Sequence, residues 1–558
     1  MLSRLGPPLT ILLLAGPVLA GLFGTLLPAF GYLPALGGIE PSLEPFRMLL
    51  TQPGIWHSAM LSLVTGLAAA ALSLGTVMLF VAAAAGTRAF SRVLHLVSPL
   101  LSVPHAAAAF GFAFLIAPSG MIARILSPWL TGWERPPDLL IVNDPMGLAL
   151  IAGLAAKEIP FLLLIALAAL PQVPLRQTRV LAASLGYGRV AGFFYGSWPA
   201  LYRQIRLAVF AVIAFSSSVV DVAAILGPTR PGTLALRLVQ WMNDPDISLR
   251  FLASAGAVLQ LGVTAGAILA WIGLERLAAR IRDFGAAGGF RFRRDRWLRR
   301  TGIAAMAASA LAMFAGLATL ILWSVAGLWP FPDALPQDFT PMSWKSALPR
   351  IAAPLGTTAA VAALATAIAT LLAVLCLIRE DRSGRKGRLA LAFIYLPLIV
   401  PQVAFLFGVQ FLFLVSGAMA SLPAMVFVHL VFVMPYVFLS LSDPWRAFDR
   451  RYEQVAHGLG RSRTETLMRV RLPMLARALL VAAAVGFAVS VGLYLPTLLI
   501  GAGRLTTVTT EAVALASGGS RRVIGVHAVL QMVLPFLGFA VATAVPALLL
   551  RRFRAMRA

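Results

Sequence analysis

Twelve stretches of about 20 mostly apolar residues recur along this chain of 558 residues, and they constrain its fold more than any other feature. A stretch of that length crosses about 30 Å of hydrocarbon as a helix, which pairs its backbone polar groups internally. The stretches lie near 9–29, 58–84, 95–118, 146–170, 207–227, 251–274, 302–328, 351–378, 389–415, 422–442, 478–500 and 526–550. The sequence therefore predicts an all-α polytopic membrane protein with about 12 transmembrane helices.

The net charge of +25 is explained by where the basic residues fall. With the N-terminus in the cytoplasm, roughly three quarters of the 46 Lys and Arg lie on the inner side, as the positive-inside rule requires. This bias predicts that both termini are cytoplasmic, and that the basic surface faces membrane lipid and not nucleic acid. The first 20 residues resemble a signal peptide, but the apolar run continues through Phe30, so we expect it to be the first helix.

One cytoplasmic segment occurs twice, and a single constant offset, close to half the chain length, relates the two copies. The residues that match at this offset are Ala182/Ala456, Leu185/Leu459, Gly186/Gly460, Arg189/Arg463, Pro199/Pro473, Leu201/Leu475 and Arg203/Arg477. Glycine allows the positive φ that a sharp turn between two short helices needs, and the proline is expected to end the second helix. Each segment is therefore predicted to form a compact helical knob on the inner surface.

Two further blocks repeat in the same order. Residues 103–115 align with 400–412 at seven of thirteen positions, and Gly227 and Thr233 recur as Gly501 and Thr507. Each half holds six predicted spans, so the two repeats run parallel, related by an axis along the membrane normal. We therefore predict a first six-helix repeat at 1–274, a basic cytoplasmic linker at 275–301 and a second six-helix repeat at 302–558.

The repeated segment resembles a known motif. The coupling-loop motif of permease subunits in type I ABC importers reads Glu-Ala-Ala, three residues, Gly, nine residues, Ile, one residue, Leu-Pro. The second copy is similar, with Gln454 in the acid position followed by Ala456, Gly460 and Pro473, whereas the first copy is degenerate, with Val180 in that position. The chain resembles single-chain duplicated permeases associated with ferric-iron, thiamine or polyamine import, which implies the type I ABC importer permease fold.

The resemblance also implies partners and a location. Two copies of a cytoplasmic ABC ATPase each receive one coupling loop, a periplasmic solute-binding protein delivers the substrate, and the chain lies in the inner membrane of a bacterial cell. A phosphate-cradling P-loop needs a Gly-Lys pair, and none of the three lysines (Lys157, Lys345 and Lys386) follows a glycine. The chain is therefore predicted to be a transport subunit with no catalytic residues and no cofactor.

Polar residues inside the predicted spans are candidates for the translocation path, because ionisable groups at membrane depth are rare and often functional. These are Ser217 and Asp221 in the fifth span, Ser490 and Tyr494 in the eleventh, and Lys157 in the fourth. Helix packing by serine hydroxyls is the alternative. The scattered histidines show no metal-ligand spacing, and the single cysteine excludes a thiolate cluster, so no metal site is expected.

An ion-coupled secondary transporter of the major facilitator type is the alternative function, because that fold also has two parallel six-helix repeats. One segment favours it: Asp381-Arg-Ser-Gly-Arg-Lys386 resembles the D-R-x-G-R-[RK] loop of that family. The preceding glycine expected there is absent, and no equivalent loop occurs in the first half.

Overall fold

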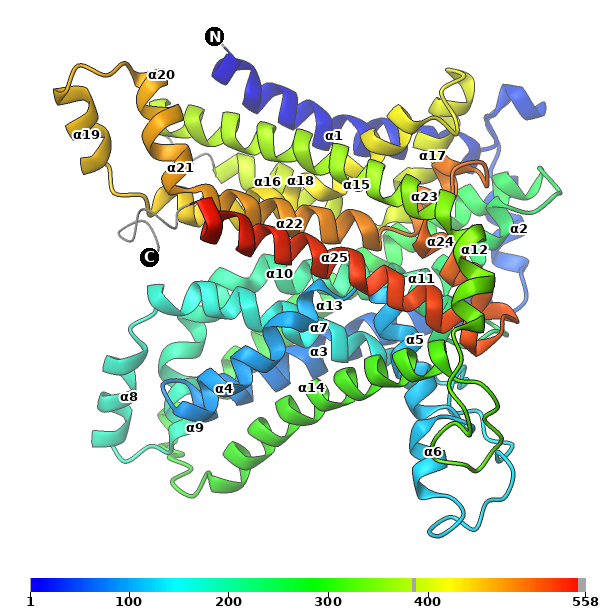
Figure 1. Ribbon diagram of the computed structural model, residues 1–558, viewed down its shortest axis with the longest axis horizontal. Coiled ribbons are helices and arrows are strands. Elements are labelled where there is room, and N and C mark those ends of the chain that lie inside the picture. The colour runs from blue at the N-terminus through cyan, green and yellow to red at the C-terminus, as the bar shows by residue number, and fades with distance from the viewer. Residues whose placement is uncertain (1, 384–387, 550–558) are drawn as a thin grey trace.

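The computed structural model describes residues 2–383 and 388–549, and they form an assembly of helices without a β-strand in that part of the chain (Figure 1). The long helices are α1 (Leu2–Ala29), α3 (Ile55–Ala84), α5 (His105–Ile116), α7 (Leu148–Ala169), α10 (Trp198–Ser218), α13 (Leu249–Ala287), α14 (Arg296–Val325), α15 (Met342–Ser383), α16 (Arg388–Ile399), α17 (Gln402–Val415), α18 (Leu422–Arg446), α22 (Ala476–Gly492) and α25 (Arg521–Leu549). The short ones are α2 (Glu44–Thr51), α4 (Arg88–Val97), α6 (Met121–Leu126), α8 (Leu175–Ser184), α9 (Arg189–Gly192), α11 (Asp221–Leu226), α12 (Leu234–Met242), α19 (Arg451–Gly458), α20 (Arg463–Thr466), α21 (Leu472–Met474), α23 (Leu495–Gly501) and α24 (Val508–Ala514).

The predicted spans are confirmed in number and order. Within the described residues, ten helices are long and apolar enough to cross a membrane, and two bent helix pairs raise the total to twelve. The bent pairs are 392–399 with 402–415, at 93°, and 463–474 with 476–492, at 70°. The predicted linker at 275–301 is largely helical, because α13 continues to Ala287 and α14 begins at Arg296. The division of the chain into two repeats stays a prediction.

Two predicted spans are interrupted at equivalent places. The fifth breaks after Ser218 and resumes at Asp221, and the eleventh breaks after Gly492 and resumes at Leu495. Both ends of the break are shifted by the same offset that relates Gly186 to Gly460. In the first break, the hydroxyls of Ser217 and Ser218 donate to the Ala214 carbonyl and compete with the regular helix bonds. Each break brings backbone that is not α-helical into the membrane, which is tolerated only where protein or a cavity surrounds it.

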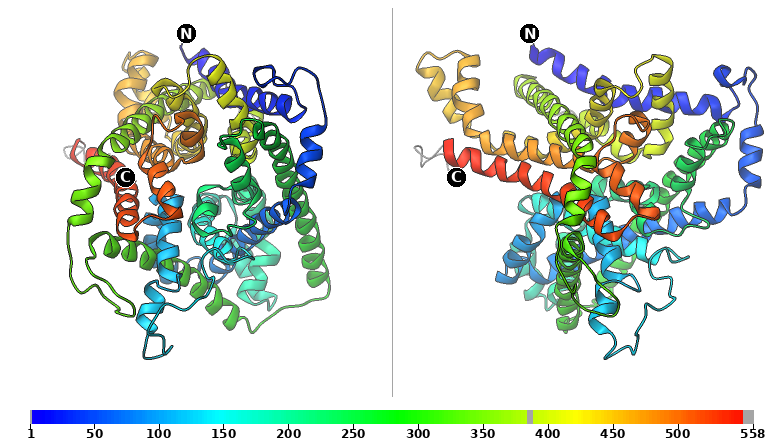
Figure 2. Two further views of the ribbon diagram at one scale, coloured as in Figure 1. Left: turned by 90° about the vertical axis from the view of Figure 1, so that its right-hand side faces the viewer. Right: turned by 45° about the vertical axis from the view of Figure 1, so that its right-hand side comes forward.

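Each half places its first helix against the other half. α1 packs against α15 and α17, whereas α14 packs against α3 and α5 (Figure 1). The end-on view in Figure 2 shows the blue α1 beside the yellow part of the second half. Two large hydrophobic cores result, and both contain residues from the two halves. Neither half therefore buries its own apolar surface alone.

Glycines permit the close crossings of these exchanged helices. A Cβ on Gly316 of α14 would lie 2.7 Å from the carbonyl carbon of Gly111 on α5, and a Cβ on Gly408 of α17 would clash with the carbonyl oxygen of Gly21 on α1. Gly111 and Gly408 are equivalent in the alignment of 103–115 with 400–412. The repeated block therefore serves the same purpose twice: it lets the backbone of the exchanged helix come close.

Gly408→Ala tests this crossing. We expect it to lower the free energy of unfolding by about 1–3 kcal/mol, because overpacking forces the two backbones apart. Gly266→Ala on α13 is the matched control, since a Cβ there meets nothing within 4 Å. It is expected to be neutral or slightly stabilising, because alanine favours the helix. Thermal unfolding of the purified protein in detergent compares the two, and equal midpoints would contradict the role of the crossing.

Candidate coupling loops and membrane path

The two predicted coupling loops have the same backbone. In the first, α8 ends in a turn at Gly186, where φ is 77°, and the chain continues through α9 and the π-helical turn η4 (Phe193–Ser197) into α10. The second repeats this through α19, Gly460 with φ of 79°, α20 and the π-helical turn η5 (Leu467–Arg471). α9 and α20, and likewise the two π-helical turns, begin and end at positions that match in the two copies.

Hydrogen bonds close the glycine turn in the same way in both loops. The Gly186 amide donates to the Ala183 carbonyl at 3.0 Å, and the Tyr187 amide donates to the Ala182 carbonyl at 2.9 Å. The equivalent bonds of the second loop are 2.9 and 3.0 Å long. Such paired bonds, with a left-handed residue between them, form the Schellman motif that ends helices at glycine. The sharp turns that the sequence predicted at Gly186 and Gly460 are therefore confirmed.

The prolines were expected to end the second helix of each knob, and this is wrong. Pro199 is the second residue of α10, and Pro473 is the second residue of α21, so each follows a π-helical turn and begins the next helix. A proline fits there because N–H groups in a first turn have no partner within their own helix.

The other predicted loop residues divide into a buried and an exposed set. Ala456 is buried and Ala182 is half-buried, so these two alanines pack inward. Gln454, in the acid position of the motif, is exposed. Exposed apolar side chains occupy matched positions of the two knobs: Leu181 and Leu185 in the first, and Val455 and Leu459 in the second. Each knob therefore presents a small apolar surface that nothing within the described part of this chain covers.

A charged network anchors the second loop. Arg471 is almost fully buried, and its Nη1 lies 2.8 Å from Asp381 Oδ2 and 3.0 Å from Glu453 Oε1. Its guanidinium also lies 4.1 Å from the centre of the Trp445 ring, and Trp445 Nε1 donates to Asp381. The network ties α19 and η5 to the ends of α15 and α18. Glu453, next to the acid position, therefore points inward and binds Arg471.

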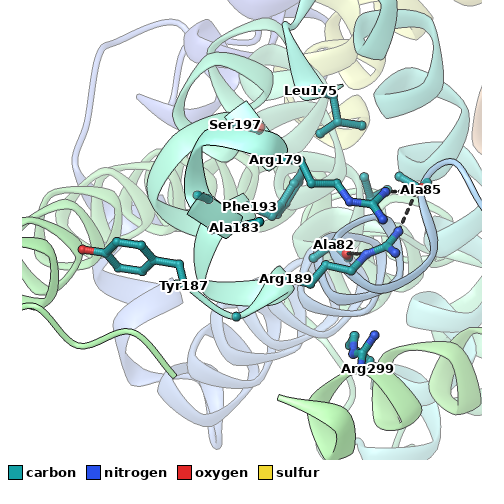
Figure 3. A pocket seen from close by; sticks show the side chains of 14 residues that line it. Ala82, Ala85, Leu175, Arg179, Ala183, Tyr187, Arg189, Phe193, Ser197 and Arg299 are labelled. Atoms are coloured by element: carbon teal, nitrogen blue, oxygen red, sulfur yellow. Dashed lines mark hydrogen bonds between the residues drawn. The ribbon is translucent and has the colours of Figure 1, made fainter. Parts of the chain in front are cut away.

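The first loop is anchored differently, because Ser197 stands where the second loop has Arg471, and Arg179 stands where it has Glu453. Arg189 donates instead to the carbonyls of Ala82 and Ala85 at the end of α3 (Figure 3). The linker completes the anchor, since Asp295 accepts a bond of 2.7 Å from the Val190 amide. The sequence analysis missed both anchors, because their members are far apart along the chain.

Arg471→Gln is expected to loosen the second knob. Removing this cation leaves Asp381 and Glu453 beside each other without their shared partner, which costs on the order of 2 kcal/mol for a largely buried network. We expect faster proteolysis between α19 and α20 and a lower unfolding midpoint. The exposed Arg463, changed to Gln, is the control for loss of one positive charge. Equal proteolysis of the two variants would show that the network does not hold the loop.

The predicted path residues lie in two kinds of surroundings. Asp221 opens α11 and is 7% exposed. Tyr494 directly precedes α23 and packs against both hydrophobic cores. The two residues therefore lie at the two helix breaks, one in each half of the chain.

The other three path candidates have packing partners. The hydroxyl of Ser217 lies 3.1 Å from that of Thr264, and the hydroxyl of Ser490 lies 2.8 Å from His429 Nδ1. Lys157 Nζ donates to the Leu100 and Leu101 carbonyls, at 3.0 and 3.2 Å. These bonds support the helix-packing alternative for the three residues, and their place along a path stays a prediction.

Further buried polar residues lie within the bundle, and among them the glutamines escaped the sequence analysis. Glu158 Oε1 lies 3.2 Å from His105 Nε2 within the first half. Two fully buried glutamines, Gln260 on α13 and Gln531 on α25, donate to Ser217 and Thr509, respectively. A signal for the glutamines was present, because the tetrapeptide Ala-Val-Leu-Gln occurs at both 257–260 and 528–531.

No metal site emerges from the described residues, since nowhere among them do three or more His, Cys, Asp or Glu side chains gather. Of the alternative loop motif at 381–386, positions 384–386 lie outside the described residues. Asp381 itself binds Arg471, Arg450 and Trp445, so the structure uses it in the anchor of the second coupling loop.

Comparisons with known proteins complete this picture. Residues 372–556 match the family of binding-protein-dependent transport system inner membrane components, and this stretch includes the better-preserved coupling loop. Over 541 residues, 96% of each chain, the sequence is 29% identical to the inner membrane ABC transporter permease protein YnjC of Escherichia coli (strain K12). The chain is thus similar to ABC transporter permeases over almost its whole length, and its second half matches the binding-protein-dependent component family.

These similarities support the predicted type I ABC importer permease fold and a multi-pass transport subunit of the inner membrane. ABC transporter permeases are transport subunits that work with ATPase subunits, which agrees with the predicted division of labour. Neither match points to an ion-coupled secondary transporter.

Proposed function

We propose that this permease forms the substrate path of an ATP-driven, binding-protein-dependent importer and is moved by a separate ATPase through its two coupling loops. This proposal rests on the two knobs, one in each half of the chain. They have the same backbone conformation, and their exposed apolar side chains occupy matched positions. Two equivalent surfaces suit two copies of one cytoplasmic ATPase, because a symmetric partner presents the same contact twice.

The proposal also includes the orientation and the other partner. α1 begins and α25 ends on the side of the molecule that carries α8 and α19 (Figure 1), so cytoplasmic termini agree with cytoplasmic loops. A periplasmic solute-binding protein would deliver substrate to the opposite side, where α2 and α12 lie. A match to binding-protein-dependent components supports this partner.

Movement of the loops would reach the membrane directly. In the first half one continuous helical stretch leads from the knob through a π-helical turn to the break before Asp221. In the second half the connection is also helical, but it bends by 70° between Met474 and Ala476 before it reaches the break near Tyr494. Helical connections suit coupling, because a loop that bends freely cannot transmit a displacement. We therefore propose that the Asp221–Tyr494 region forms the polar part of the path, with Ser217, Ser490 and Lys157 on the helices around it.

The two glycine turns provide the test of coupling. We expect Gly460→Asp to reduce uptake more than Gly186→Asp. At 186 the new carboxylate can pair with the Arg293 guanidinium, which lies 3.2 Å from the added Cβ, whereas at 460 nothing lies within 4 Å of the added Cβ to compensate the charge. Uptake of the cognate substrate in cells and copurification of the ATPase are measured together, with membrane levels as the control. Equal tolerance of both substitutions would remove the docking role of the loops.

Asp221→Asn tests the path. It keeps the size of the side chain and removes the charge, so we expect an unchanged unfolding midpoint and at least about a tenfold loss of uptake, equivalent to ~1.4 kcal/mol in the rate-limiting barrier. Lys157→Met is the comparison, and it is expected to lower the unfolding midpoint because the Leu100 and Leu101 carbonyls lose their donor. Unchanged uptake in Asp221→Asn would place the path elsewhere.

A further inference from the structure

We propose that a phosphate group, carried by an anionic phospholipid or free in solution, binds in a basic cavity beside the first coupling loop. The cavity has a volume of about 260 Å³ and lies between the loop, the end of α3 and the start of α14 (Figure 3). Three arginines line it: Arg179, Arg189 and Arg299. Figure 3 shows Arg179 and Arg189 side by side at the end of α3, with Arg299 reaching in from a neighbouring helix.

The charges around this cavity are not balanced. Arg179 and Arg299 both act on Arg189 as like charges, and Asp295 is the single carboxylate that acts on it in return. Asp295 is already committed twice, because it accepts from the Val190 amide and lies 3.2 Å from Arg299 Nε. One carboxylate against three guanidiniums leaves two positive charges uncompensated. An anion in the cavity would relieve this repulsion.

The arginines also have donors to spare. Arg189 uses Nε and Nη2 on the Ala82 and Ala85 carbonyls, and Arg179 makes one long bond of 3.5 Å from Nη1 to Ala85. A guanidinium has five N–H donors, so several remain for a ligand. Planar guanidinium forks match the oxygens of a phosphate, which suits this chemistry better than a single ammonium group would.

The position of the cavity favours a phosphate at the membrane surface. α3 ends at Ala84 and α14 begins at Arg296, so the cavity lies level with the cytoplasmic ends of two spanning helices. Anionic headgroups of the inner leaflet occupy this level. The exposed Leu181 and Leu185 are not part of the lining, so the cavity is distinct from the apolar surface proposed to meet the ATPase.

The second loop differs at this point, since Glu453 stands in the position of Arg179 and binds Arg471. A negative side chain there would repel a phosphate. The proposal therefore makes the two loops unequal: an external anion stabilises the first, and the internal network stabilises the second.

The test uses the purified full-length protein in a nonionic detergent, with thermal unfolding as the readout. Phosphatidylglycerol, phosphatidylcholine at the same mole fraction, and inorganic phosphate at constant ionic strength are added separately. We expect phosphatidylglycerol to raise the unfolding midpoint and phosphatidylcholine not to. Arg179→Gln and Arg299→Gln should each raise the half-saturating concentration of phosphatidylglycerol at least fivefold, whereas Arg300→Gln, an exposed neighbour outside the cavity, should leave it unchanged.

Each other outcome is decisive as well. Equal stabilisation by inorganic phosphate, lost in the same two variants, supports the site with a soluble anion as its ligand. Stabilisation that Arg300→Gln weakens as much as Arg179→Gln does would reflect diffuse attraction and overturn the proposal. The proposal would also be overturned if Arg179→Gln and Arg299→Gln bound the ATPase less well but responded normally to phosphatidylglycerol, because the cavity would then bind the protein partner. Since the readout does not require transport, the result is independent of the proposed importer function.

Discussion

The exchange of first helices between the halves is the constraint on which the rest of this structure depends. α1 is buried against α15 and α17, and α14 against α3 and α5, through crossings at which glycines bring the backbones almost into contact. In lipid no hydrophobic effect drives helices together, so close packing and hydrogen bonds must do so. Each hydrophobic core contains parts of both halves, so neither half packs independently of the other.

The coupling loops show how one backbone can be held by two sets of side chains. Both knobs have the same turn and the same π-helical segment, yet Arg471 with Asp381 and Glu453 anchors one, whereas Arg189 and Asp295 anchor the other. The linker between the halves has become part of the first knob. A fused chain permits this difference, because its two copies are free to diverge in sequence while the shared backbone preserves their shape.

The polar residues of the membrane region are also distributed unequally. Lys157, Glu158 and Asp221 lie in the first half, and the second half offers hydroxyls and His429 at membrane depth. Most of these groups have partners, which is the condition for burying them without a large energetic penalty. Asp221 and Tyr494 are distinct because they lie at the two helix breaks, and Tyr494 contacts both hydrophobic cores.

Local features of the chain were predictable because they depend on neighbours in sequence. Apolar runs of sufficient length specified the spans, Gly186 and Gly460 specified the turns, and the constant offset between the two copies specified that the knobs would be alike. The helix exchange, the Arg471 network, the docking of Asp295 on the first knob and the place of Tyr494 against both cores were decided only by the tertiary structure. Each of these joins segments far apart along the chain, and a single sequence holds no measure of which distant helices will pack. Even the prolines show this limit: their missing N–H marked a helix boundary, but whether a helix ended or began there depended on the π-helical turn before them.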